Sequence, residues 1–278
     1  MTNFKFTIQF DKFQNIAQRF TFLPGINIVY GASGVGKSFF LSCIEGESLN
    51  QSYNFQIDHK NRAFVYHRIF QNPDNQIIGR SVRGELSFSG ECKGKPVSEL
   101  QMIIESGLDQ LPDTIDSYMN PGLLSGGEKE LLNLTTAMQS SPDILIIDDG
   151  LSFLSSENKL IAVNWLRAWA NNTSSIVVWV TSEKNDLEFG DTKWALDLDS
   201  FKKIECVNPE HYDSIYIPEG SLSLKWTDVS FKYDNSRRIY SDLSLSLDGC
   251  RSVGLLGSNG SGKTTFSGLC FGYLKPQK

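Results

Sequence analysis

The chain has 278 residues, of which 40% are hydrophobic and 21% are charged, and its formal net charge is -6 at pH 7. This apolar content supports a packed core and excludes a disordered chain, and the length suits one large domain or one domain and part of another. The acidic balance leaves no excess of lysine and arginine to neutralise phosphates, which argues against non-specific nucleic-acid binding.

The first part of the chain predicts two strands and a glycine-rich loop. Residues 4–10 alternate apolar and polar side chains, and residues 26–30 form a short apolar run. The second run leads directly into Gly31-Ala-Ser-Gly-Val-Gly-Lys-Ser38, which fits the pattern G-x-x-x-x-G-K-[ST]. Residues 38–46 predict a helix that ends at Gly46. A strand, such a loop and a helix N-terminus in this order direct backbone N–H groups toward phosphate.

Residues 63–70 predict another strand, followed by Gln71-Asn-Pro-Asp-Asn-Gln76. The proline and the Asn/Asp cluster end regular structure, so Gln71 is expected at a strand-to-loop junction. Residues 80–139 carry helical patterns and no run rich in strand-forming residues. They predict a helical insert inside an α/β core.

A helix in this insert is expected to begin at Leu124-Ser-Gly-Gly-Glu128. Ser125 at the N-cap with Glu128 three residues later makes a capping box, and helix capping alone is one interpretation of the motif. Residues 143–148 then form an almost wholly apolar strand, as expected for a sheet covered on both faces, and this run leads to two acids, Asp148 and Asp149. The next expected elements are a helix at 157–170 and strands at 175–181, 193–198 and 202–207.

Residues 207–220 contain two prolines and few aliphatic side chains, and they predict a linker. Residues 221–278 then predict three strands, the third over residues 249–257, a second glycine-rich loop and a helix, which repeats the opening of the chain. The second loop, Gly257-Ser-Asn-Gly-Ser-Gly-Lys-Thr264, fits the same pattern as the first. A plain turn is the alternative interpretation of either loop, and two full matches in one chain disfavour it.

These motifs together resemble the ATPase subunits of ATP-binding cassette (ABC) transporters, whose signature is LSGGE or LSGGQ. The order of glycine-rich loop, glutamine loop, signature, acidic strand end and switch strand covers residues 1–206. The run FQNPDNQIIGRSVRGELSF at 70–88 looks most like the ATPases of energy-coupling-factor importers, which take up vitamins, cobalt or nickel. An ordinary Asn-Pro turn is the alternative interpretation of this run.

The resemblance implies an α/β P-loop NTPase fold of the ABC type, with a parallel core sheet, an antiparallel β-subdomain and a helical subdomain. It implies an ATPase domain at 1–206, a linker at 207–220 and, at 221–278, the N-terminal part of a second, truncated ATPase domain. ATP and Mg²⁺ are the implied ligands, and ATP hydrolysis is the implied activity.

The family's motifs imply roles for the matching residues. Ser38, Gln71 and Asp148 would organise Mg²⁺, and Asp149, Gln71 and Ser182 occupy catalytic positions. The signature residues Ser125, Gly126 and Gly127 would face the nucleotide of a partner domain, because two domains of this family clamp ATP head to tail. The implied nucleotide-binding residues of the first domain are Gly31, Ser33, Gly34, Gly36, Lys37, Ser38 and Phe39. Those of the second segment are Tyr233, Asn259, Gly260, Gly262, Lys263, Thr264 and Thr265, with Thr264 also an Mg²⁺ ligand.

The residue that stacks on adenine is less clearly marked than the phosphate-binding loops. Tyr233 matches the family's position in the second segment, where a half-buried strand tyrosine is the alternative interpretation. Phe10 and Phe13 are the nearest candidates in the first domain. The second segment carries no signature, acidic strand end or switch residue of its own, so we expect it to expose apolar surface and to be unstable without a partner or the remainder of such a domain.

Three departures from the family's pattern fall near one implied ATP site. The acidic strand is followed by Asp149-Gly150 where the family has Glu-Pro, and an aspartate is one methylene shorter than the usual glutamate. A misplacement of about 1 Å can cost on the order of a hundredfold in rate. Ser182 stands where the family has histidine, and the loop at 153–155 reads Phe-Leu-Ser where it normally ends in Leu-Asp. We therefore expect a site that binds ATP more than it hydrolyses it, beside an intact signature.

The implied function is that of the ATP-hydrolysing energy subunit of an importer. Its partners would be a second ATPase domain, in a homodimer or heterodimer, and an integral-membrane coupling subunit. The implied location is cytoplasmic, at the inner face of the cell membrane. Five dispersed cysteines without paired spacing agree with a reducing compartment, the N-terminus lacks a signal-peptide pattern, and no apolar run approaches about 20 residues.

Two other functions use the same motifs. An ATP-sensing or regulatory cassette without a transport role is the alternative that Asp149 and Ser182 favour. A cassette ATPase of the DNA-repair type would need a long coiled-coil insert between Gln71 and Ser125, and that segment is too short to hold one.

Overall fold

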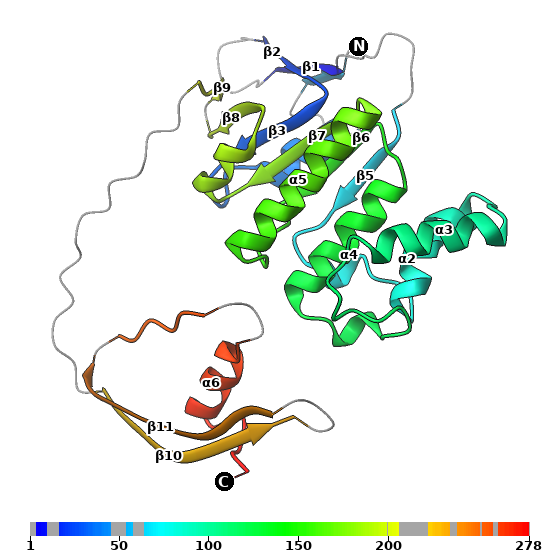
Figure 1. The fold of residues 1–278 in the computed structure, drawn as a ribbon. Coiled ribbons are helices and arrows are strands. Elements are labelled where there is room, and N and C mark those ends of the chain that lie inside the picture. The colour runs from blue at the N-terminus through cyan, green and yellow to red at the C-terminus, as the bar shows by residue number, and fades with distance from the viewer. Residues whose placement is uncertain are drawn as a thin grey trace. The chain divides into compact units, whose positions relative to one another are not determined.

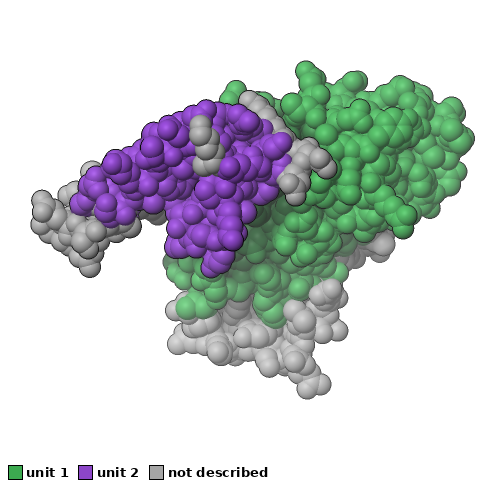
Figure 2. Space-filling model, turned by 90° about the horizontal axis from the view of Figure 1, so that it is seen from below, with its two compact units in different colours: residues 1–208 green, residues 209–278 purple. Residues whose placement is uncertain are grey.

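The computed structural model describes residues 4–9, 17–45, 54–57, 64–198, 200–205, 222–233, 238–250, 252–257 and 261–277. The chain divides into two compact units, Met1–Asn208 and Pro209–Lys278, which Figure 2 shows in different colours. The linker predicted at 207–220 lies outside the described residues.

A six-stranded sheet forms the centre of the first unit (Figure 1). Its strand order is β5-β6-β7-β3-β8-β9, in which β9 runs antiparallel to β8 and the other neighbours are parallel. The strands are β3 (Gly25–Tyr30), β5 (Tyr66–Ile69), β6 (Ile144–Asp148), β7 (Ile176–Thr181), β8 (Thr192–Leu196) and β9 (Phe201–Lys203). The mostly parallel sheet confirms the predicted α/β class.

Apolar clusters cover both faces of this sheet. Leu145 and Ile147 of β6 belong to the cluster that contains side chains of α4 (Gly126–Gln139) and α5 (Ser156–Thr173). The alternate side chains of β6 belong to the opposite cluster, together with those of α1 (Lys37–Ile44). Side chains of a strand point alternately to the two faces, so a strand buried on both sides needs an unbroken apolar run.

The predicted helical insert is present. Figure 1 shows α2 (Val82–Cys92) and α3 (Val97–Leu108) side by side, with α4 next to them. Two short 3₁₀ helices, η1 (Pro73–Asn75) and η2 (Pro121–Leu123), stand before and after this pair in the chain. The helices approach closely at Gly107, where a Cβ atom would lie 2.6 Å from a methyl carbon of Leu86.

A three-stranded antiparallel sheet with the order β2-β1-β4 forms the β-subdomain. Its strands are β1 (Phe4–Gln9), β2 (Ala17–Phe22) and β4 (Asn54–Ile57). The pattern of residues 4–10 predicted β1, whereas β2 and β4 were not predicted. Each of these two contains only two large apolar residues, too few for a clear alternating pattern.

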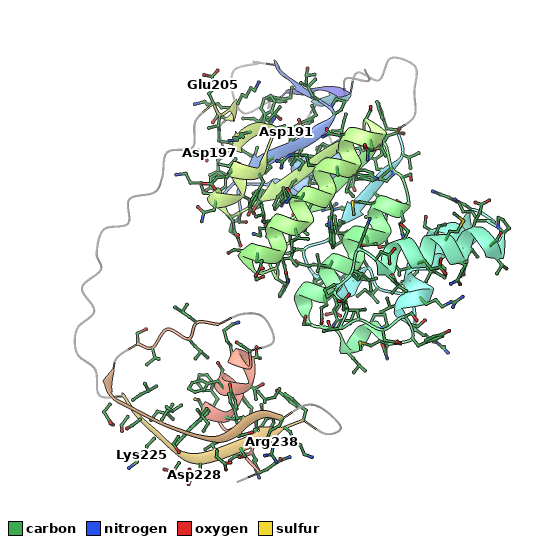
Figure 3. The ribbon with its side chains drawn as sticks, viewed as in Figure 1. Asp191, Asp197, Glu205, Lys225, Asp228 and Arg238 are labelled. Atoms are coloured by element: carbon green, nitrogen blue, oxygen red, sulfur yellow. The ribbon has the colours of Figure 1, made fainter. Side chains whose placement is uncertain are left out.

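A contact with the exposed residue Asp191 holds the beginning of β3. Asp191, which Figure 3 labels, lies between η3 (Lys184–Phe189) and β8, and its carboxylate accepts a hydrogen bond from the N–H of Ile26 at 2.8 Å. A Cβ atom on Gly25 would lie 2.6 Å from the same carboxylate, and Gly25 has a positive φ of 111°. Glycine therefore satisfies both the backbone angle and the space at this point.

The described residues of the second unit form one hairpin and one helix. Strands β10 (Leu222–Lys232) and β11 (Arg238–Cys250) pair antiparallel, and α6 (Lys263–Cys270) follows them. The ring of Trp226 on β10 lies 4.6 Å from the ring of Phe266 on α6, measured between centroids. Arg238, labelled in Figure 3, begins β11 opposite Lys232.

The third strand expected over 249–257 is wrong as a separate element. Strand β11 continues to Cys250, and residues 252–257 have no regular secondary structure. Within the described part of this unit no further strand pairs with them, and a strand requires such a neighbour for its backbone hydrogen bonds. Their apolar side chains are exposed, and Leu256 is 95% exposed, as expected for this segment.

No helix among the described residues has both the length and the apolar character needed to cross a bilayer.

Candidate functional site

The carboxyl ends of three parallel strands, β3, β6 and β7, bring several predicted site residues of the first unit to one edge of the sheet. Tyr30 of β3 pairs with Thr181 of β7, and Asp148 of β6 pairs with Val180. Backbone hydrogen bonds continue beyond the strands, because the N–H of Gly31 reaches the carbonyl of Thr181 at 3.0 Å. The first glycine-rich loop, the acidic pair and Ser182 therefore begin at the same edge, where ligands of open parallel sheets bind.

The loop has the backbone that its glycines allow. Gly34 and Gly36 have positive φ angles of 83° and 101°, and Gly36 is the N-cap of α1. Residues with a Cβ adopt these angles rarely. Ser33, Gly34, Gly36 and Ser38 are exposed, and Phe39 is half-buried. The loop thus opens to solvent at the N-terminus of a helix, an arrangement that favours anions.

Lys37 is the best-connected residue of the loop. Its side chain is 8% exposed, and its ammonium donates hydrogen bonds to the carbonyls of Gly31 at 3.0 Å and Ala32 at 3.2 Å. A third hydrogen bond, of 2.8 Å, goes to Oγ of Ser182. These contacts hold the cationic group inside the curve of the loop.

The carboxylate of Asp149 is joined to both of these side chains. It accepts hydrogen bonds from the backbone N–H of Ser182 at 2.6 Å and from its hydroxyl at 2.8 Å, and Nζ of Lys37 lies 3.5 Å away. Asp149 also has a left-handed backbone, with φ at 48°. The structure therefore brings Lys37, Asp149 and Ser182 into one cluster.

Asp148 has a partner that the sequence motifs did not identify. Nη2 of Arg68, on β5, lies 2.6 Å from Oδ2 of Asp148, and Nη1 lies 2.9 Å from Oε2 of Glu45 at the end of α1. The guanidinium carbon is 5.3 Å from the centre of the Phe70 ring. A charged side chain inside the apolar run at 63–70 was the available signal for Arg68.

The implied Mg²⁺ ligands have the atom types that the ion prefers. However, the one carboxylate among them is already neutralised by an arginine. Hydroxyl, amide and carboxylate oxygens are ligands that Mg²⁺ accepts. Ser38 and Gln71 are exposed, and within the described residues no hydrogen bond joins them to each other or to Asp148. The described residues contain no group of three or more His, Cys, Asp or Glu side chains that could hold a metal. Moreover, the Asp148 carboxylate already pairs with a cationic side chain.

The signature residues begin α4 with the predicted capping box. Oγ of Ser125 accepts the N–H of Glu128 at 3.3 Å, and Oε2 of Glu128 accepts the N–H of Ser125 at 2.8 Å. Gly127 is buried, and a Cβ atom on Gly126 would lie 3.0 Å from the ring of Phe153. Both glycines thus permit close packing at the start of this helix.

Glu130 connects α4 to the loop after β6, and the motifs did not identify it. It is 2% exposed, and its Oε2 accepts the N–H of Phe153 at 3.0 Å. Burial raises the pKa of Glu130 to about 7, against the lowering effect of the backbone N–H groups of residues 151–153 and of the Lys159 charge. The buried carboxyl of Glu130 therefore links the signature helix α4 to the loop that follows the acidic end of β6.

The second glycine-rich loop repeats the geometry of the first where it is described. Gly262 is the N-cap of α6 with φ at 96°, and Nζ of Lys263 donates to the carbonyl of Gly257 at 2.7 Å. Thr264 is exposed, and Thr265 is buried with its Oγ1 3.2 Å from the hydroxyl of Tyr233. Asn259 and Gly260, like Phe10 and Phe13, lie outside the described residues.

Comparisons with known proteins agree with these motifs. Residues 20–152 match the family described as ABC transporter. The energy-coupling factor transporter ATP-binding protein EcfA1 of Streptococcus agalactiae is 27% identical over 148 residues, which are 53% of this chain and 51% of that protein. The EcfA1 protein of Lactiplantibacillus plantarum is 28% identical over 178 residues, covering 59% of this chain and 62% of the relative. The chain thus spans about half of the Streptococcus relative and less than two thirds of the Lactiplantibacillus one.

Two solved structures share the fold. CbiO1 from Clostridium perfringens, part of the ABC transporter complex CbiONQ, has a TM-score of 0.60 at 16% identity and covers 72% of this chain and 88% of its own. The ATP-binding cassette MJ0796, solved as a dimer with ADP and phosphate, has a TM-score of 0.58 at 18% identity and covers 71% and 98%. Residues 20–152 are thus similar to the ABC transporter family, and this chain shares the α/β P-loop fold of the two solved ATP-binding proteins.

Proposed function

We propose that this chain is an ATP-binding and ATP-hydrolysing energy subunit of an ABC-type importer of the energy-coupling-factor kind. The cluster of Lys37, Asp149 and Ser182 at the first glycine-rich loop carries the proposal. A buried ammonium behind exposed backbone N–H groups is a phosphate site, and the adjacent carboxylate lies where a water could be oriented. The similarity to EcfA1 proteins, which are energy-coupling factor transporter ATP-binding proteins, supports the transporter class.

The geometry of the cluster also supports a weakened hydrolytic role for the first site. In the structure the Asp149 carboxylate accepts two hydrogen bonds from Ser182, at 2.6 and 2.8 Å, and is engaged with Lys37. A carboxylate whose oxygens already accept two hydrogen bonds and face a cation has fewer lone pairs left to orient an attacking water. We therefore assign this site to ATP binding more than to turnover.

The signature of the first unit is proposed to serve a partner's nucleotide. Ser125 and the glycines after it begin α4 with a complete capping box, so the helix start is ordered. The dipole of a helix favours an anion at this end. We further propose ATPase domain boundaries at 1–206 and a partial second domain at 221–278, because the loop before α6 repeats the contact between the P-loop lysine and the first glycine's carbonyl. A second ATPase domain and an integral-membrane coupling subunit at the inner membrane face complete the proposed assembly.

The test compares two variants of the chain in its assembled pair of ATPase domains. Lys37→Ala removes the buried ammonium and should weaken nucleotide binding at least about tenfold with limited loss of turnover. Ser125→Arg places a long cationic side chain at the start of α4 and should abolish turnover. Fluorescent-ATP titration measures affinity, and phosphate release measures turnover. Full loss of turnover in Lys37→Ala, with turnover kept in Ser125→Arg, would contradict the assignment.

A regulatory ATP-sensing cassette is the second candidate, and the engaged Asp149 carboxylate favours it. The two candidates differ in their partner, because only an importer subunit needs a membrane protein. A small, highly apolar membrane protein encoded beside this gene and co-purifying with the chain supports transport. A soluble neighbour that co-purifies in its place supports regulation.

A further inference from the structure

We propose that Arg68 acts as a built-in cation at Asp148 and makes nucleotide binding at the first glycine-rich loop largely independent of Mg²⁺. The inference rests on the proposed ATP-binding function and specifies the kind of ligand that this site takes: the nucleotide without its divalent ion. Asp148 is an implied ligand of Mg²⁺, yet its carboxylate already forms an ion pair with the Arg68 guanidinium.

The sheet register fixes the Arg68–Asp148 pair. Arg68 of β5 lies opposite Ile146 of β6, and Asp148 is two residues further along the same strand. Paired residues and residues two apart point to the same face of a sheet, so Arg68 and Asp148 are diagonal neighbours. Ile146 belongs to the apolar cluster on the α1 side, which places the pair on the face that carries the P-loop helix.

The contact is short and well shielded from water. The side chains of Arg68 and Asp148 are 17% and 14% exposed, and their charged atoms are 2.6 Å apart. The second bond of the guanidinium, to Glu45, prevents Arg68 from turning away without losing another charge-assisted hydrogen bond. The ring of Phe70 also lies near the guanidinium.

Arginine keeps its charge at every physiological pH, so this neutralisation is permanent. A divalent ion at Asp148 would have to compete with the guanidinium for a carboxylate oxygen, or share the carboxylate with a second positive charge. Either arrangement weakens the ion's hold on the protein. In turn, Arg68 already removes the repulsion between the Asp148 carboxylate and a polyphosphate, which is the effect that a bound ion has there.

The experiment measures fluorescent-ATP binding to the full chain with and without Mg²⁺. A Lys263→Ala change in every protein weakens the second loop, so that the first loop dominates the signal. The parent protein should bind with affinities that differ by less than about threefold between millimolar Mg²⁺ and excess EDTA. Arg68→Met, an uncharged side chain that removes the cation, should bind at least about tenfold more tightly with Mg²⁺ than without it.

Two further variants separate charge from structure. Arg68→Lys keeps a cation beside Asp148 and should behave like the parent protein. Glu45→Gln removes the other carboxylate of the arginine and leaves the Asp148 contact, so it should also remain insensitive to Mg²⁺. Direct binding of Mn²⁺ to the nucleotide-loaded chain, followed by water-proton relaxation, should be stronger in Arg68→Met than in the parent.

Strong Mg²⁺ dependence in the parent protein overturns the inference, and this measurement stands even if Arg68→Met fails to fold. Equal Mg²⁺ dependence in the parent and a folded Arg68→Met also overturns it. If no nucleotide binds with or without Mg²⁺, the proposed ATP-binding function itself falls, and the inference falls with it.

Discussion

Burial of Glu130 gives this single carboxyl a large effect on how the stability of the fold depends on pH. Its side chain lies between the signature helix and the loop after β6, and its carboxylate accepts a backbone N–H of that loop. The charged form loses water there, and hydrogen bonds recover only part of the loss. The native state therefore holds a proton on Glu130 more tightly than the unfolded chain does.

This raised pKa predicts a specific pH dependence of stability. Between the ordinary pKa of 4.5 and the native value of about 7, the native state binds more protons, so the free energy of unfolding falls as pH rises. The fall is complete above pH 7 and amounts to at most about 3 kcal/mol. Glu130→Gln carries no titrating group and should lack this part of the pH dependence.

Urea unfolding at pH 4.5, 6 and 8 measures the effect as the difference between wild type and variant. Glu157→Gln removes an exposed carboxyl from α5 and serves as the matched control, with the wild-type slope expected. An unchanged slope in Glu130→Gln would show that folding does not raise the pKa of this carboxyl.

At the scale of elements, a buried lysine joins α5 to the segment after β7. Nζ of Lys159 lies 2.9 Å from Oδ1 of Asp186 and 2.8 Å from Oε2 of Glu183. Asp186 is 4% exposed in its side chain and also accepts the hydroxyl of Thr181 at 2.6 Å, whereas Glu183 is 53% exposed. A pocket of about 210 Å³ borders the same side chains. One lysine thus has a buried and an exposed partner.

The two partners should differ sharply in their effect on stability. Lys159→Met leaves the Asp186 carboxylate buried without its cation and should cost on the order of 3 kcal/mol. Glu183→Gln removes an exposed charge from the same lysine and should cost less than about 1 kcal/mol. Thermal unfolding of both variants checks this, and equal losses would mean that burial does not decide the strength of the pair.

The elements that the sequence predicted are those whose pattern is long and uniform. The apolar run ending at Asp148 could be predicted because a strand buried on both faces needs apolar side chains at successive positions. The helix at 157–170 could be predicted because one buried stripe repeats apolar side chains at helical spacing. The short strands β2 and β4 could not, because each contains only two large apolar residues and local patterns do not show that both pair with β1. The contact between Arg68 and Asp148 also depends on strand register, which local patterns do not encode.

The candidate site was predictable where a local motif determines the backbone. The loop at 31–38 and the capping box at Ser125 follow from short patterns with a physical cause, and the structure shows both. Glu130 and Arg68 lie outside such patterns. Their roles arise from side chains that meet across elements. A charged residue inside an apolar run was a local sign of Arg68, whereas Glu130 directly follows Glu128 and Lys129 and breaks no local pattern.

At the scale of the molecule, the two units differ in how their backbone N–H and C=O groups are hydrogen-bonded. The central strands of the first unit pair on both sides, whereas residues 252–257 of the second unit lie in no described sheet. Backbone N–H groups exchange with solvent according to the free energy that opens their hydrogen bonds. The two segments should therefore differ in hydrogen exchange.

We expect amides of 252–257 to exchange at nearly the rate of an unfolded peptide, and those of β7 to exchange only through global unfolding. Hydrogen exchange of the full chain, read by mass spectrometry, tests this, with β10 as an internal comparison inside the second unit. Protection of 252–257 equal to that of β7 would show that the segment pairs as a strand in solution.

The left-handed backbone at Asp149 restricts which residues evolution or an engineer can place there. Aspartate, asparagine and glycine adopt such angles readily, and longer side chains do so at a cost of about 1 kcal/mol. A glutamate at this position would thus gain a methylene of reach and lose backbone compatibility, unless the turn after β6 were rebuilt with it. The short side chain of Asp149 and the left-handed turn that carries it therefore depend on each other. A more active version of this site would need a new backbone conformation here as well as a longer side chain.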